Sequence, residues 1–263
     1  MKFDFSNKNI FVGGATDGIG WECAKLFSNL GANVILVARN SQKLENRKSE
    51  LYNNGSQNHM ILALDYTDPT TLEANLTNFI SQNNLIFDIV INNTGGPPGG
   101  PLHKSTTDHL LSAFNMHLIS FHKILGITVE GMKSKDYGRI INIISTSVKQ
   151  PLNGLGVSNT IRGAVANWSK TLANELGEFN ITVNNVLPGA TNTGRLNEII
   201  SAKAKKLNSE ESTILKQMAN EVPMNRIAEP IEVANAVVFL ASQNASYING
   251  INLPVDGGRT KSL

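Results

Sequence analysis

Apolar runs alternate with amphipathic segments from the first residues of the chain to about Leu187. Several runs are largely apolar throughout, as in residues 33–37 and 139–144, instead of alternating in polarity. Strands that are buried on both faces have this pattern, which is typical of parallel sheets. The predicted strands cover residues 10–13, 34–38, 60–64, 86–92, 139–145, 181–187 and 251–254.

The segments between these runs have helical spacing. In the first of them Ile19, Cys23, Phe27 and Leu30 are separated so that they share one helix face. Gly31 follows as a C-terminal stop signal. The other predicted helices cover residues 41–53, 69–83, 106–132, 157–179 and 230–241.

This regular alternation of strand and helix predicts a doubly wound α/β fold of the Rossmann type. Right-handed crossovers then place helices on both faces of a seven-stranded parallel sheet. The chain has 263 residues and no internal repeat, and we interpret residues 1–263 as a single domain. Two segments have no clear periodicity: residues 93–105 are rich in Gly and Pro, and residues 190–222 are polar.

Charge and cysteine usage exclude several classes of function. The net charge is +2, which provides no electrostatic footprint for nucleic acid or for a membrane surface. Cys23 is the only cysteine, so no internal disulfide is possible and a reducing compartment is the simpler interpretation. The first six residues lack a signal-peptide core, and no continuous apolar run approaches ~18 residues. We therefore expect a cytoplasmic protein without nucleic-acid or membrane partners, and we predict no metal site.

The first predicted strand runs directly into a glycine-rich turn, residues 13–20, and a helix begins at once. Glycines permit a tight turn and a close approach of backbone to a pyrophosphate, while N–H groups at the helix start face the anion. The strand before the turn and the helix after it distinguish this signal from a plain glycine-rich turn.

The spacing Gly14-x-x-x-Gly18-x-Gly20, with the layout of the whole chain, resembles the short-chain dehydrogenase/reductase family. The resemblance covers nearly all 263 residues and is closest to the 3-oxoacyl-acyl-carrier-protein reductase branch. Matching segments occur along the chain at Asn92-Asn93-Thr94-Gly95, Asn115, Asn142, Ser145, Pro188-Gly189 and Asp256-Gly257-Gly258.

The resemblance implies a set of cofactor contacts. Asp65 corresponds to an adenine contact, Pro188 and Gly189 lie beside the nicotinamide, and Arg162 lies at the nicotinamide ribose. The remaining implied cofactor residues are Gly14, Thr16, Asp17, Gly18, Ile19, Gly20, Arg39 and Asn92.

The residue after the second strand bears on the choice between NAD(H) and NADP(H). An acidic residue there holds the ribose hydroxyls of NAD. Arg39 stands there instead, and its guanidinium suits a 2′-phosphate. Arg39 can also be a solvated strand-end residue, and the Asp17 carboxylate opposes a phosphate nearby. The sequence favours NADP(H) over NAD(H).

The predicted catalytic helix departs from the family pattern. Family members carry a proton-donating Tyr and, four residues later, a Lys, whereas this chain has Ser158 and Arg162. Ser145 occupies the position of the Ser that orients the substrate carbonyl, and Asn115 that of the helix-kinking Asn. A serine hydroxyl is a poor proton source, and loss of a general acid typically costs 10²–10⁴-fold in rate. Arg162 stays charged, so it can bind ribose hydroxyls, an oxyanion, or a carboxylate or phosphate.

Other groups can fill the place of the missing acid, and each has a structural alternative. His103 lies on the glycine- and proline-rich segment, and a solvated histidine is the more common case there. Lys149 faces either substrate or water. His117 lies two residues after Asn115, roughly on the opposite side of that helix. Ser158 can simply cap its helix.

Two functions remain open at this point. The first is an NADP(H)-dependent oxidoreductase that interconverts an alcohol and a ketone, either a 3-oxoacyl thioester or a related small carbonyl. The second is an NADP(H)-binding protein without redox turnover, a sensor or a partner in a biosynthetic complex.

The resemblance also implies a homo-oligomer, a dimer or tetramer. The apolar stripe of Ala164, Val165, Trp168 and Leu172 is either its interface or core. Residues 190–222 are expected to cover the substrate as a lid. The lysines of this lid, Lys203, Lys205 and Lys206, either attract an acidic carrier or are solvated.

Overall fold

The protein forms a seven-stranded sheet with the strand order β3-β2-β1-β4-β5-β6-β7, in a computed structural model that describes residues 3–262. Every neighbouring pair of strands is parallel. This confirms the predicted fold class. The strands are β1 (Asn9–Gly13), β2 (Asn33–Ala38), β3 (Met60–Ala63), β4 (Ile89–Asn92), β5 (Gly138–Ile143), β6 (Ile181–Pro188) and β7 (Asn252–Val255).

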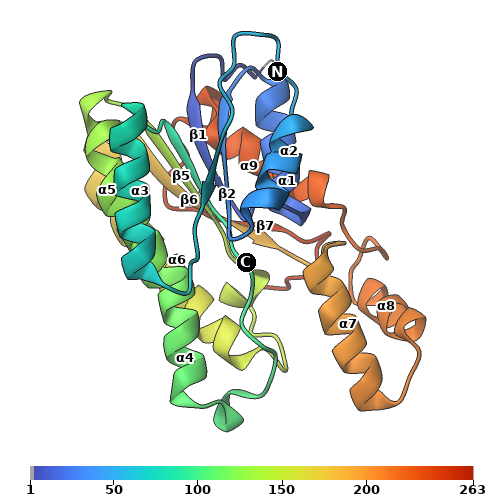
Figure 1. The fold of residues 1–263 in the computed structure, drawn as a ribbon. Coiled ribbons are helices and arrows are strands. Elements are labelled where there is room, and N and C mark those ends of the chain that lie inside the picture. Colours follow the sequence, from blue (N-terminus) through green and yellow to red (C-terminus); the bar gives the residue numbers. More distant parts are fainter. Residues whose placement is uncertain (1–2, 263) are drawn as a thin grey trace.

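Helices cover both faces of the sheet (Figure 1). On one face lie α1 (Gly18–Asn29), α2 (Ser41–Ser49) and α9 (Pro230–Ala241); on the other lie α3 (Pro69–Asn83), α5 (Ser120–Ser134) and α6 (Gly156–Leu176). Successive residues of β1 belong to opposite layers, because Ile10 and Val12 pack with α1 and α9 whereas Phe11 packs with α3 and α5. A strand of this kind is apolar on both faces, which explains the continuous apolar runs in the sequence.

The predicted strand boundaries are wrong at two places. Residues 86–88 lie before β4, where Ile86 is 38 % exposed and the buried Asp88 accepts a hydrogen bond from the Asn9 N–H. The apolar run begins early because Phe87 packs in the core without joining the ladder. Ser145 likewise lies beyond the end of β5, and its hydroxyl begins the 3₁₀ turn η3 (Thr146–Val148).

Residues 190–222 are not irregular, as the sequence analysis expected, but contain α7 (Gly194–Leu207) and α8 (Glu211–Asn220). The two helices share a small apolar cluster of their own, made by Leu196, Ile200, Ala204, Ile214 and Met218. Residues 196, 200 and 204 are apolar and have i, i+4 spacing, so the sequence contained a helical signal although the segment is mostly polar. Figure 1 shows the pair standing at the same end of the molecule as α4 (Thr107–Phe114).

The long predicted helix at 106–132 is interrupted by a π-helical turn, η2 (Asn115–Ile119), between α4 and α5. In the described chain this continuous run, Thr107–Ser134, is the one helix long and apolar enough to span a membrane by length and composition alone. The run passes that test although it is not continuously apolar, and 33 % of its most apolar window is buried. Phe121 and Ile124 anchor it in the core beside α3.

Candidate functional site

The predicted site residues gather where the strand order reverses between β1 and β4. At such a switch point the loops after the two strands diverge and leave a crevice at the carboxyl ends, where α/β proteins bind ligands. The loop after β1 lies on one side of it, and the loops after β4, β5 and β6 lie on the other.

The turn between β1 and α1 has the backbone of a phosphate cradle. Gly14 and Gly18 have φ values of +60° and +55°, which favour glycine. A Cβ at Gly14 would stand 2.6 Å from Asn93 Nδ2, and one at Gly20 would stand 2.3 Å from the Gly14 carbonyl oxygen. Asp17 is the N-cap residue of α1, and its side chain accepts no capping hydrogen bond. The first amides of α1 therefore have no side-chain acceptor and can serve an anion.

Two arginines flank this turn. Arg39 follows β2, is exposed, and has no hydrogen bond or ion pair within residues 3–262. Arg47 on α2 donates from Nε to the Thr16 carbonyl oxygen at 3.0 Å and stacks over the Trp21 ring at 4.6 Å. Arg47 was missed by the sequence analysis, although it lies three residues after the buried Leu44 and so shares its helix face.

The other predicted cofactor residues lie at the strand ends. Asp65 is exposed, and its Oδ1 accepts from the N–H and hydroxyl of Thr67 at 2.9 and 2.7 Å. Gly189 donates its N–H to the Val255 carbonyl oxygen at 3.0 Å, which ties the end of β6 to β7. Ile19 is half-buried in the first turn of α1. Pro188 is the last residue of β6.

Asn92 is buried at the end of β4, and its Nδ2 donates to Asn142 Oδ1. It begins a ladder of four asparagines that are in register across β4, β5, β6 and β7: Asn92, Asn142, Asn185 and Asn252. Their side chains join through hydrogen bonds of 2.8, 3.1 and 2.8 Å, and the Ser169 hydroxyl on α6 bonds to the two middle members. The ladder therefore fixes α6 to the strand ends.

Helix α6 carries Ser158 and Arg162, the two predicted catalytic residues of this helix. Ser158 lies in its first turn and is half-buried, and the N-cap residue is Leu155, so Ser158 is not the cap. Arg162 follows one turn later on the same face. Its Nη1 donates to the Ile143 carbonyl oxygen at 2.9 Å, on the strand that leads to Ser145. The Ser145 Oγ accepts from the Ser147 N–H at 3.0 Å.

Arg162 is a buried cation, with 7 % of its surface exposed. Burial, followed by the charge of Arg195, lowers the Arg162 pKa to about 10. Within the described chain its Nε has no hydrogen-bond partner. Arg195 lies in the first turn of α7 and was missed by the sequence analysis, because no local pattern connects residue 195 to residue 162. Its Nη2 donates to the Pro97 carbonyl oxygen at 2.6 Å, and its Nη1 pairs with Glu198 at 2.9 Å.

The candidate replacement acids lie in different surroundings. His117 is fully buried in η2, with its ring edge-to-face against Phe121. Burial, followed by the charge of Arg162, holds the His117 pKa well below its usual value, so the ring is neutral near pH 7. His103 is exposed in the 3₁₀ turn η1 (Leu102–Lys104), and Lys149 is half-buried after η3. Asn115 begins the π-helical turn, at the kink that the resemblance implied.

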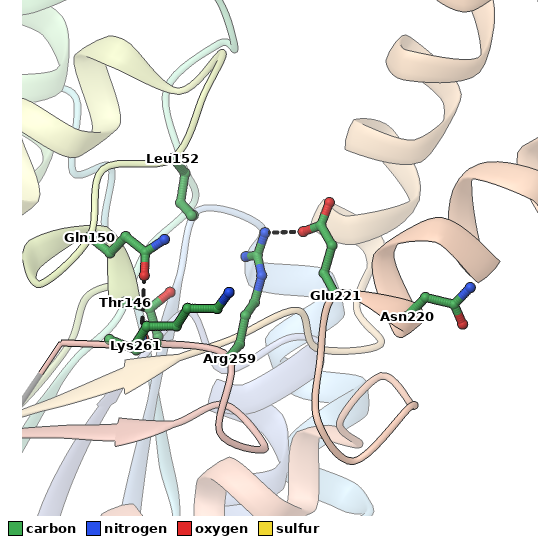
Figure 2. A pocket seen from close by; sticks show the side chains of 8 residues that line it. Thr146, Gln150, Leu152, Asn220, Glu221, Arg259 and Lys261 are labelled. Carbon is green, nitrogen blue, oxygen red and sulfur yellow. Dashed lines mark hydrogen bonds and ion pairs between the residues drawn. The ribbon is translucent and has the colours of Figure 1, made fainter.

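A cavity of about 380 Å³ lies between Thr146 and the C-terminal tail (Figure 2). The Gln150 side chain accepts a hydrogen bond from the Lys261 N–H at 3.3 Å, and Arg259 pairs with Glu221 at the end of α8. The tail thus bridges the loop after β5 and the end of the α7–α8 pair. The cavity lining is mostly polar: Thr146, Gln150, Leu152, Asn220, Glu221, Arg259, Thr260 and Lys261.

Comparisons with known proteins agree with this geometry. A family model described as Enoyl-(Acyl carrier protein) reductase matches residues 14–260. NADPH-dependent reductase BacG of Bacillus subtilis (strain 168) is 29% identical, over 98% of this chain and 100% of its own. 3-Oxoacyl-[acyl-carrier-protein] reductase FabG of Vibrio harveyi is 32% identical over 97% of this chain and 98% of its own.

Among solved structures, L-sorbose reductase from Gluconobacter frateurii, complexed with NADPH and L-sorbose, superposes with a TM-score of 0.92. It is 28% identical, and the match covers 100% of both chains. The fold, the glycine cradle at the switch point and these full-length similarities lead to one conclusion. The chain belongs to the short-chain dehydrogenase/reductase family, a family of nicotinamide-dependent oxidoreductases.

Proposed function

We propose that the protein is an NADP(H)-dependent oxidoreductase that interconverts a ketone and an alcohol, with Ser158 and Arg162 replacing the Tyr and Lys of its family. The observation that carries this proposal is the intact cradle. No side chain fits beside Gly14 or Gly20, and the first backbone amides of α1 have no side-chain hydrogen-bond acceptor. The nicotinamide cofactor fits these residues, and when bound it supplies or accepts the hydride.

Preference for NADP(H) is supported by the charge around the cradle. Arg39 is exposed and unpartnered within residues 3–262, while Arg47 holds the turn through Thr16. A guanidinium binds a phosphate through paired hydrogen bonds, which a ribose hydroxyl cannot match. The exposed Asp17 carboxylate opposes a phosphate, and Arg47 is already paired with Glu50 at 2.8 Å, so the preference rests on Arg39. The relative BacG is named as NADPH-dependent, and L-sorbose reductase was solved with NADPH.

The residues of this chain divide the chemistry among them. The Ser145 hydroxyl donates a hydrogen bond to the substrate carbonyl oxygen and orients it. The charge of Arg162 stabilises the negative charge that develops there during reduction. The buried His117 ring is neutral at pH 7 and is not the donor. The proton comes from the Ser158 hydroxyl, from His103 or from a bound water. Such a donor is weak, so we expect slow turnover.

A turnover assay tests this function. NADPH absorbance is followed with short hydroxy ketones, short oxo acids and 3-oxoacyl thioesters, while NADPH binding is measured separately by fluorescence. The expected result is binding together with slow, Ser145-dependent oxidation of NADPH by at least one class. The Ser145→Ala variant should lose about 10²-fold in kcat. Tight NADPH binding without turnover across the panel would reject the proposal.

The missing Tyr favours a second candidate, an NADP(H)-binding protein without redox turnover. It shares the cradle and differs only at the proton donor. In that case wild type binds NADPH but does not oxidise it with any substrate of the panel. The double variant Ser158→Tyr, Arg162→Lys then acquires turnover that wild type lacks. Measurable wild-type turnover rejects this candidate.

The run α4–η2–α5 supports a homo-oligomer. Only 33 % of its most apolar window is buried within one chain, so a second copy of the chain can cover the rest. On α6, Val165 and Leu172 belong to the core, while Ala164 and Trp168 stay half-buried and accessible to a partner. We expect a dimer or tetramer by sedimentation; a monomer at all concentrations tested contradicts this expectation.

A further inference from the structure

We propose that Arg47 is a positioning residue for the cofactor: it orients the peptide unit between Thr16 and Asp17 so that the Asp17 N–H is available to a phosphate oxygen. The inference rests on the nicotinamide cofactor of the proposed function, but it concerns the glycine-rich turn and not the reduction step. It assigns to a side chain of α2 a contribution to cofactor affinity that does not depend on the 2′-phosphate.

Arg47 contacts both ends of the segment that runs from the glycine-rich turn into α1. Its Nε donates to the Thr16 carbonyl oxygen at 3.0 Å, and its guanidinium lies over the Trp21 ring, 4.6 Å from the ring centroid. Trp21 lies near the start of α1 and is itself buried. One guanidinium therefore fixes the turn and the first residues of the helix relative to each other.

The contact at Thr16 determines the direction of the next amide. A trans peptide unit is planar, so its carbonyl and its N–H point in opposite directions. The Thr16 carbonyl oxygen points toward Arg47 on α2, and the Asp17 N–H consequently points away from α2. Within residues 3–262 this N–H has no hydrogen-bond partner. An N–H of this kind, at the N-cap of a helix, is suited to an anion.

Other contacts hold the turn only on the side of the strand. The Gly13 carbonyl oxygen accepts from Asn93 Nδ2 at 3.1 Å, and the Ala15 N–H donates to the Val37 carbonyl oxygen at 3.1 Å. For residues 16–18, the bond from Arg47 is the one hydrogen bond to another element within the described chain. The part of the turn that leads into the helix therefore depends on Arg47.

The charge of Arg47 is already taken up within the chain. Its Nη1 pairs with Glu50 at 2.8 Å on the same helix, while Nε serves Thr16. Arg39, by contrast, is exposed and has no hydrogen bond or ion pair within residues 3–262. We therefore expect Arg39 to sense the 2′-phosphate, and Arg47 to affect any dinucleotide that occupies the turn.

The affinities for two cofactors test the proposal. Binding of NADPH and of NADH is measured by fluorescence titration. Arg47→Met keeps an unbranched side chain against Trp21 but removes the donor to Thr16, and we expect Kd to rise about tenfold for both cofactors. Lys48→Gln removes the same charge from the next position of α2, where Lys48 pairs with Glu45, and should leave both Kd values unchanged. A loss confined to NADPH would make Arg47 a ligand of the 2′-phosphate and overturn the inference.

A variant that keeps the charge separates position from charge. Arg47→Lys replaces the planar fork with a single ammonium, which cannot meet Thr16, Trp21 and Glu50 together. We expect Kd to rise for both cofactors, though by less than in Arg47→Met. Wild-type affinity in Arg47→Lys, alongside a loss in Arg47→Met, would mean that only the charge matters and would contradict the positioning role.

Hydrogen exchange of the cofactor-free protein provides a readout that needs neither cofactor nor turnover. The Ala15 and Trp21 amides lie at the two ends of the segment and donate to backbone carbonyl oxygens at 3.1 and 3.3 Å. Both should exchange faster in Arg47→Met than in wild type or in Lys48→Gln, and unchanged exchange would overturn the inference. If wild type binds both cofactors and Arg47→Met weakens both, but no ketone is reduced, the proposed function fails and the role of Arg47 stands.

Discussion

The cofactor half of the site is built from backbone, and the substrate half is built from side chains. The cradle depends on positive φ angles at Gly14 and Gly18 and on amides at the start of α1. The substrate half, as proposed, depends on the side chains of Ser145, Ser158 and Arg162. The cradle contacts lie on β1 and α1, and the three side chains lie just after β5 and on α6, so the fold can keep the cradle with different side chains in the substrate half.

The largest expected effect is on the cradle. Gly20→Ala places a methyl group 2.3 Å from the Gly14 carbonyl oxygen and 2.7 Å from that of Gly13, and neither backbone atom can yield cheaply. We expect NADPH binding to become undetectable by fluorescence titration and stability to fall by about 1–3 kcal/mol in urea. Gly163→Ala on α6 is the matched control, since a Cβ there meets nothing within 4 Å. Normal NADPH affinity in Gly20→Ala would contradict a backbone-built cradle.

The next effect concerns the proton donor. Restoring the family residues in the double variant Ser158→Tyr, Arg162→Lys should raise kcat for neutral ketones by about 10²-fold, because it returns a general acid. The solvent isotope effect on kcat should fall in parallel. Either single variant serves as the control and should gain less. A double variant no faster than wild type would mean that another group already donates the proton.

A smaller effect is expected at the ribose end of the cradle. Arg39→Gln should weaken NADPH by about tenfold and leave NADH nearly unchanged, because only NADPH carries the phosphate that the guanidinium meets. Lys43→Gln, on the nearby exposed surface of α2, is the control. Equal losses for both cofactors in Arg39→Gln would reject the assignment of Arg39 to the 2′-phosphate.

The smallest expected effect is on how stability depends on pH, through the buried His117. The folded pKa of His117 lies below its unfolded value near 6.5, so the unfolded state binds more protons in the window beneath it. The contribution of a neutral His117 is complete above pH 6.5 and is lost as the pH falls toward the folded pKa. Between pH 6.5 and 5.5 wild type should lose about 1 kcal/mol more stability in urea than His117→Phe. The exposed His103→Gln should retain the wild-type dependence.

Local sequence patterns predicted much of the fold and the cofactor half of the site. The strands were predicted to within three residues because parallel strands are apolar throughout, and the cradle because only glycine fits its backbone. The helices α7 and α8 were missed although residues 196, 200 and 204 have helical spacing. Their cluster is small and separate from the main core, so polar residues dominate the composition of that segment.

The contacts that were missed join residues far apart in the chain. Arg47 meets Thr16 across 31 residues, and Arg195 meets the backbone at Pro97 across 98. The asparagine ladder joins four strands. Its side chains lie opposite one another only because the register of the sheet pairs these residues. Such pairs leave no pattern within the sequence of a single helix or strand.

The sequence by itself determined the fold class, the seven strands and the position of the glycine-rich turn that opens α1, and it supplied Ser158 and Arg162 as candidate residues on α6. These are properties of residue type and of neighbours along the chain. Only the tertiary structure decided that His117 is a neutral buried group and that Arg162 is a buried cation bonded to the Ile143 carbonyl oxygen. Burial and electrostatic interaction depend on which residues the fold brings together, so no local pattern of residue types reports them.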